Sequence, residues 1–95
     1  GGIAVECDVR SDEQGEAAVK AARDAHGAAR ISVCCAGVSE SRLMLDRNGP
    51  APLADHRRIV EIHLIGTYNI NRLVAADMAD CDPVADTSRD CATFQ

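Results

Sequence analysis

Aromatic residues are nearly absent from this chain, which has one Tyr, one Phe and no Trp among 95 residues. Surfaces that bind single-stranded nucleic acid stack bases on aromatic side chains, and the basic residues here are scattered rather than clustered. Together with a formal net charge of −5, this argues against a nucleic-acid partner. No stretch approaches the roughly 18 consecutive apolar residues of a membrane-spanning helix, so we expect no membrane partner either.

The cysteines lack the spacing of a disulfide framework, and their number is odd. They occupy positions 7, 34, 35, 81 and 91. This pattern, and the lack of a signal-like segment in the first residues, favours reduced thiols and a cytoplasmic location. Adjacent residues of a strand point to opposite faces, so Cys34 and Cys35 are better interpreted as small buried hydrophobic residues than as metal ligands, and we predict no metal site. A thiol or metal protein remains the alternative if Cys7 lies close to either.

The first part of the chain predicts a strand followed by a helix. Apolar residues alternate over residues 3–9, which is typical of a half-buried strand. Ser11 then fits a capping box with Gln14, so a helix should begin there. The helix should run to about Ala25 and end at Gly27, a residue suited to the left-handed conformation of a helix terminus.

A second strand is predicted over residues 31–36, because Ile31 and Val33 are β-branched and a tight Ala36-Gly37 turn follows. The order strand, helix, strand implies a parallel pair joined by a right-handed crossover. Ligands bind at the carboxyl ends of parallel strands, and an Ala-Gly pair lets a ligand approach the backbone closely. We therefore expect a ligand site at this turn.

A long helix is predicted over about residues 53–80, after a loop over residues 39–52. Apolar residues occur on nearly every side of its central part, which is typical of a helix buried on more than one face. We expect one face to lie against the sheet and another against a partner helix or subunit. Glycine is unfavourable in the middle of a helix, so Gly66 should mark a close backbone contact. Residues 82–95 are polar without a clear period and resemble a loose tail.

Several short motifs, in their order and spacing, resemble the short-chain dehydrogenase/reductase family over about residues 3–80. The motifs are Cys7-Asp8-Val9, Cys35-Ala36-Gly37, Leu53-Ala54-Asp55 with Arg58-Ile59, and Leu64-Ile65-Gly66-Thr67-Tyr68-Asn69. Within the family, the chain is most similar to the branch of 3-hydroxyacyl-CoA and hydroxysteroid dehydrogenases. That branch shares the Cys before Ala-Gly and a Gly-Pro-x-x-Leu pattern like that of residues 49–53.

The resemblance implies an α/β fold, namely a partial Rossmann-like β-α-β-α segment over residues 1–81 with parallel strands and a long buried C-terminal helix. It implies a nicotinamide cofactor, NAD with NADP not excluded, and hydride transfer between a secondary alcohol and a ketone. In this family Asp8 would contact the adenine ring, and Val9 would lie beside it. Cys35, Ala36 and Gly37 would pass under the adenosine ribose.

The family's catalytic groups are missing from these 95 residues. The sequence has no glycine-rich phosphate turn and no Tyr-x-x-x-Lys pair, since Tyr68 is followed four residues later by Arg72. His63 occupies the position of a proton-relay Asn and is the candidate catalytic residue, although a hydrogen-bonded structural His is the alternative. We interpret the chain as a truncated family member that is inactive alone. The alternative is a non-catalytic interaction module that forms a homo-oligomer through residues 53–80.

Overall fold

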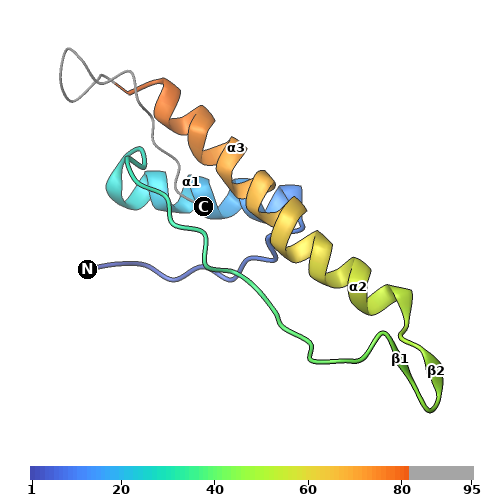
Figure 1. Ribbon diagram of the computed structural model, residues 1–95. Coiled ribbons are helices and arrows are strands. Elements are labelled where there is room, and N and C mark those ends of the chain that lie inside the picture. The colour runs from blue at the N-terminus through green and yellow to red at the C-terminus, as the bar shows by residue number, and fades with distance from the viewer. Residues whose placement is uncertain (82–95) are drawn as a thin grey trace.

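Two helical segments make up most of the regular structure in the computed structural model, which describes residues 1–81 (Figure 1). Helix α1 spans Asp12–His26. The second segment is one continuous rod, in which α2 (Leu53–Val60), the π-helical turn η1 (Glu61–Ile65) and α3 (Gly66–Ala79) follow one another. α1 lies across α3, and extended chain runs before α1 and between the two helical segments.

Helix α1 begins and ends where the sequence predicts. The Ser11 hydroxyl accepts a hydrogen bond from Gln14 N at 3.2 Å, which satisfies one of the free donors of the first turn. Gln14 Oε1 accepts from Asp8 N at 2.7 Å, so the Gln side chain reaches further back than in a capping box. Gly27, at φ 82°, ends the helix and donates to Arg23 O at 2.8 Å.

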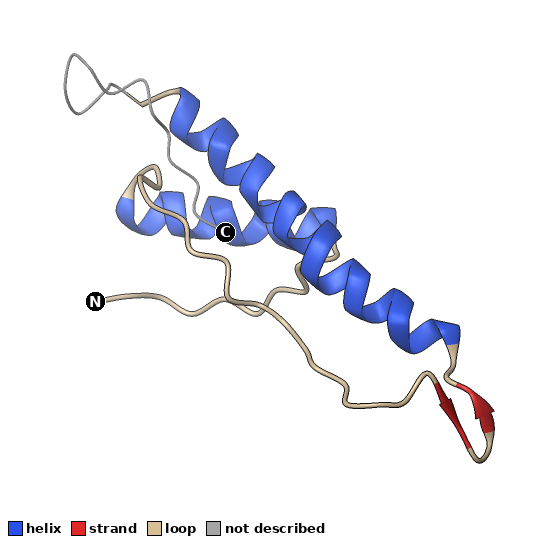
Figure 2. Cartoon of the chain, in the orientation of Figure 1, coloured by secondary structure: helices blue, strands red, loops and turns tan. Residues whose placement is uncertain are grey.

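The parallel strands predicted over residues 3–9 and 31–36 are absent, and that prediction is wrong. Both segments are extended, but neither forms a strand (Figure 2). The one sheet within residues 1–81 pairs β1 (Leu45–Asp46) with β2 (Gly49–Pro50) in antiparallel register. A parallel pair is stable only where helices cover both faces, and here Ile31 is 81% exposed. The partial Rossmann-like fold is therefore not confirmed.

The loop predicted before the long helix contains this small hairpin. Asp46 Oδ1 accepts a hydrogen bond from Asn48 N at 2.7 Å, which closes the turn. Gly49 follows with φ 110°, a conformation that side chains other than glycine disfavour. Ala51 N donates to Met44 O at 2.8 Å beyond the two strands. The hairpin projects past the first turn of α2, at one end of the molecule (Figure 1).

The predicted long helix is confirmed, but the prediction that it is buried on more than one face is wrong. One side is buried and contacts α1 and the chain before it; its buried residues are Gly66, Asn69, Val74 and Asp77. On other sides, Leu64 is 68%, Ile65 is 51% and Tyr68 is 69% exposed. The apolar pattern of the sequence reports which residues can be buried, whereas burial itself requires a second surface, and α1 covers one side only.

Polar contacts hold α1 on α3. Arg23 Nη1 lies 2.5 Å from Asp77 Oδ1, and Ala29 N donates to Asp77 Oδ2 at 3.3 Å. Val74 is the one buried hydrophobic residue among residues 1–81. No helix in this part of the chain combines the length and apolar content that crossing a membrane requires. The polar tail predicted over residues 82–95 lies outside the described residues.

Candidate functional site

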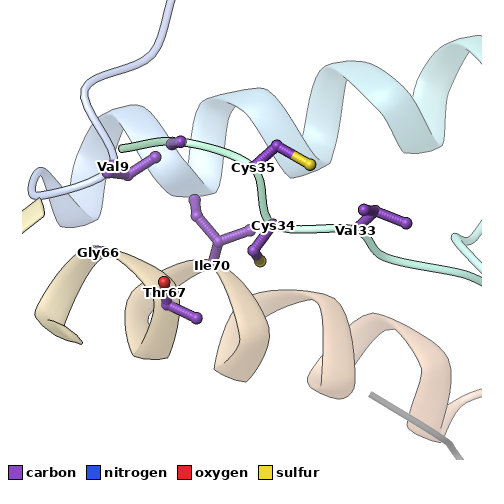
Figure 3. A pocket seen from close by; sticks show the side chains of 8 residues that line it. Val9, Val33, Cys34, Cys35, Gly66, Thr67 and Ile70 are labelled. Carbon is purple, nitrogen blue, oxygen red and sulfur yellow. The ribbon is translucent and has the colours of Figure 1, made fainter. Parts of the chain in front are cut away.

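An apolar groove of about 160 Å³ lies where two extended segments pass over the start of α3 (Figure 3). It is lined by Val9, Val33, Cys34, Cys35, Ala36, Gly66, Thr67 and Ile70. Pockets that enclose a whole small molecule occupy roughly 300–1,000 Å³, so this groove can hold only part of such a ligand. None of its lining side chains is charged.

Gly66 lets Val9 approach α3. A Cβ at position 66 would lie 2.5 Å from Val9 Cγ2, which is closer than real Cβ contacts, and 3.1 Å from Val9 Cβ, which is tighter than most of them. The close contact predicted at this glycine is therefore confirmed, and the group in contact is the Val9 side chain. Ile70, one turn further along α3, points toward the space between Val9 and Cys34 (Figure 3).

Asp8 precedes the groove residue Val9 in the chain, and Arg10 holds its carboxylate. Arg10 Nη2 donates to Asp8 Oδ2 at 2.8 Å, and Arg10 Nε and Arg10 N each donate to Oδ1 at 3.0 Å. These hydrogen bonds, led by the side-chain ones, lower the pKa of Asp8 to about 2. Asp8 is therefore an ionised hydrogen-bond acceptor throughout the physiological pH range. Burial, with a smaller effect of the Asp8 charge, raises the pKa of the neighbouring Cys7 thiol.

The two adjacent cysteines have different surroundings. Cys34 is half-buried, and its Sγ donates to Asn71 Oδ1 on α3 at 3.3 Å. Cys35 is exposed, so the interpretation of both residues as buried is wrong for this one. The chain is not a strand here, and only one of the two side chains turns toward the helix. Residues 1–81 contain no group of three or more His, Cys, Asp or Glu side chains arranged to hold a metal ion.

His63 lies outside the groove and contacts the turn after Ala36. Its Nε2 atom is 2.7 Å from Val38 O and 3.0 Å from Val38 N. A single ring nitrogen can donate to the carbonyl or accept from the N–H, so the tautomer decides which bond forms. A Cβ on Gly37 would lie 2.5 Å from His63 Cε1, so this glycine provides space for the imidazole rather than lining the groove.

The structure thus brings together three of the predicted site residues and separates three others. Val9, Cys35 and Ala36 line one groove, whereas Asp8 precedes Val9 in the chain without lining it, and Gly37 and His63 contact each other. Helix α3 contributes three groove residues that were not among the predicted site residues, namely Gly66, Thr67 and Ile70. Their spacing would place them on one side of a helix, so the signal was present in the sequence.

Comparison with known proteins adds sequence evidence. No family model matches the chain. It is 36% identical over 78 residues to the 3-hydroxyacyl-CoA dehydrogenase type-2 of Bos taurus, a match that covers 80% of this chain and 30% of the relative. The protein of the same name from Homo sapiens is 32% identical over 78 residues, with the same coverage. That from Drosophila melanogaster is 32% identical over 89 residues, which is 92% of this chain and 35% of the relative.

The chain therefore spans about a third of the length of the curated relatives that it matches. These relatives bear the name of the branch that the motifs resemble. The resemblance predicted from the sequence is thus confirmed: the matched part of the chain is homologous to the short-chain dehydrogenases/reductases of the 3-hydroxyacyl-CoA dehydrogenase branch.

Proposed function

We propose that Asp8, Val9 and Cys35–Gly37 form the adenosine side of a nicotinamide dinucleotide site, in an oxidoreductase that interconverts a secondary alcohol and a ketone. The observation that supports this most directly is the groove itself. Val9 comes from one part of the chain and the adjacent Cys35 and Ala36 from another, and all three line it. The similarity to dehydrogenases supports the reaction class.

The residues present fit the adenosine part of such a cofactor. The ionised Asp8 carboxylate can accept a hydrogen bond from an exocyclic amine, even while Arg10 holds it, because a carboxylate offers about four acceptor positions. Ala36 lines the groove with no more than a methyl side chain, so a sugar can lie close to its backbone. The lining has no cation to bind a phosphate, so we place only the nucleoside in the groove and the phosphates outside it.

When bound, the nicotinamide ring would supply the hydride acceptor or donor. The 95 residues contain no Tyr-x-x-x-Lys pair to move the alcohol proton, so we propose that on their own they bind without catalysing. His63, at the position of the family's relay Asn, remains the candidate for proton transfer in a complete site. An assay of alcohol oxidation with NAD by the purified 95-residue chain should give no turnover above buffer, and measurable turnover would contradict this part of the proposal.

The finer assignments follow the resemblance. The relatives are named for a 3-hydroxyacyl-CoA substrate, so we propose a hydroxyacyl-CoA or hydroxysteroid-like alcohol, with NAD favoured over NADP. We also propose that residues 1–81 act as one nucleotide-binding unit in the cytoplasm. The exposed apolar side chains of Leu64, Ile65 and Tyr68 support a homo-oligomer formed through residues 53–80, because such side chains gain stability when a second copy covers them.

Calorimetric titration with NAD and with NADH tests the binding proposal. Ala36→Leu should fill the groove and weaken binding by about tenfold or more, which corresponds to at least about 1.4 kcal/mol. The matched control is Ala22→Leu, on an exposed side of α1 away from the groove, which should leave affinity unchanged. Absence of binding by the unaltered chain, or equal affinity for the Ala36→Leu variant, would contradict the proposal.

A further inference from the structure

A buried amide connects α3 to the turn that precedes α1. Asn69 is 6% exposed, and its Nδ2 atom donates to Val9 O at 2.9 Å and to Ser11 O at 3.1 Å. Gly15 makes room for this contact, because a Cβ there would lie 3.1 Å from Asn69 Nδ2 and 3.0 Å from Leu73 Cδ1. Both hydrogens of one amide group are thus bound to carbonyls of a single turn, far away in sequence.

Arg72 fixes the orientation of this amide. Its Nη2 atom donates to Asn69 Oδ1 at 2.7 Å and also pairs with Asp12 at the start of α1. Since a guanidinium can only donate, the amide oxygen must face Arg72, and the amide nitrogen must face the turn. The amide has a partner at its oxygen and at both of its hydrogens, which is the condition for a rigid buried polar group.

The turn that Asn69 holds carries two residues of the proposed site, Asp8 and Val9. The carbonyls that accept from Asn69 belong to Val9 and Ser11, and between these two residues lies Arg10, which holds the Asp8 carboxylate. Val9 itself lines the groove and packs on Gly66. A shift of the Val9 carbonyl would therefore move one wall of the groove and the Asp8 acceptor together.

We propose that Asn69, oriented by Arg72, is a positioning residue for the nucleotide groove, acting through the carbonyls of Val9 and Ser11. This inference rests on the proposed function and extends it to a side chain that does not line the groove. Asn69 does not itself contact the adenosine. It determines where the backbone of the turn lies above α3, and so where Asp8 and Val9 meet the adenosine.

Two substitutions of similar size separate positioning from packing. Asn69→Asp keeps an acceptor for Arg72, but as a carboxylate held by this guanidinium it loses both donors. Asn69→Leu cannot donate at any pH. The charged groups beside position 69 are Arg72 on α3 and Asp12 on α1, which pair with each other. Asn48→Asp places the same charge at the hairpin turn, away from the groove, and is the matched control.

The experiment combines NAD titration at pH 7 with circular dichroism and with hydrogen exchange of the amides of residues 8–11. Asn69→Leu should speed exchange in this turn and weaken binding about tenfold or more. Asn69→Asp should do the same, while Asn48→Asp should match the unaltered chain. Because Asp has nearly the size of Asn, weakened binding by Asn69→Asp at unchanged helix content indicates a lost donor rather than lost packing.

The outcomes are distinguishable from those of the function test. If the unaltered chain binds NAD and Asn69→Leu binds equally well, the inference is overturned and the proposed function stands. If both variants lose helix content, Asn69 is merely structural, and the inference is again overturned. If the unaltered chain does not bind NAD, the proposed function and the inference fall together.

Discussion

At the residue scale, one arginine determines the charge state of the proposed adenine acceptor. Arg10 approaches both carboxylate oxygens of Asp8 and also lies 3.8 Å from Glu61. The sequence predicted the position of Asp8, because the Asp-Val step is a local motif. It did not predict the Arg10 pairing, because that depends on a turn in which the Arg side chain folds back over the residue two positions earlier.

Replacing Arg10 with Met should raise the pKa of Asp8 from about 2 toward its ordinary value of 3.8. The folded-state pKa lies below the ordinary value, so the stabilisation that this pair provides is present above about pH 4 and is lost as the pH falls toward 2. An NMR titration of the Asp8 carboxyl carbon measures the shift directly. Arg42→Met, which breaks a pair with Asp55 elsewhere, should leave the Asp8 pKa unchanged. An unchanged Asp8 pKa in the Arg10 variant would contradict the assignment.

The two buried helical glycines should respond differently to alanine. At Gly66 the new Cβ meets Val9 Cγ2 and Cβ, so overpacking of about 1–3 kcal/mol should exceed the gain of about 1 kcal/mol in helix propensity. At Gly15 the new Cβ would lie 3.0 Å from Leu73 Cδ1 and 3.1 Å from Asn69 Nδ2, so the neighbours need a smaller shift than at Gly66, where the nearest distance is 2.5 Å. Urea denaturation should therefore show Gly66→Ala less stable than Gly15→Ala. The reverse order would mean that Val9 does not pack on α3.

At the element scale, helices could be predicted from the sequence and strands could not. The signals of α1 are local: the Ser11 cap, acidic residues in the first turn and Gly27 at the end. A strand has no equivalent, because its hydrogen bonds lie on another segment. Residues 3–9 and 31–36 have strand composition, but neither finds a pairing partner among the described residues, so both remain extended chain.

Removing the helix cap tests the local part of this account. Ser11→Ala deletes the acceptor for Gln14 N and should destabilise α1 by about 1 kcal/mol, within the range of about 0.5–2 kcal/mol for such caps. Ser41→Ala, in the exposed chain before the hairpin, should have no measurable effect. Circular dichroism during urea denaturation compares the two variants. Equal stability of both would show that the Ser11 hydroxyl does not cap the helix.

At the scale of the whole molecule, the fold is extended and has little core. Its radius of gyration is 17.1 Å, against about 12 Å for a compact domain of this length. Val74 is the one buried hydrophobic residue in the described part of the chain, whereas many larger apolar side chains are exposed. The sequence correctly indicated which residues are apolar. It could not indicate how many would be covered, because coverage depends on surfaces that residues 1–81 do not provide.

The uncovered side of the long helix leads to a prediction about association. Sedimentation of the unaltered chain should show a concentration-dependent oligomer, because Leu64, Ile65 and Tyr68 lose contact with water when copies pair. Ile65→Lys should shift the population to monomer. Met44→Lys, at a more exposed apolar residue next to the hairpin, should not. A chain that stays monomeric at all concentrations, with its helices folded, would contradict a role of residues 53–80 in oligomer formation.

The central claim is that the groove on α3 receives the adenosine end of a nicotinamide dinucleotide. The most direct measurement is NMR mapping of backbone amides while the 95-residue chain is titrated with adenosine monophosphate, and separately with nicotinamide mononucleotide. We predict that adenosine monophosphate shifts the amides of Asp8, Val9 and Cys35–Gly37, and that nicotinamide mononucleotide leaves them unchanged. Equal shifts with both compounds, or no shifts at these residues with either, would contradict the account.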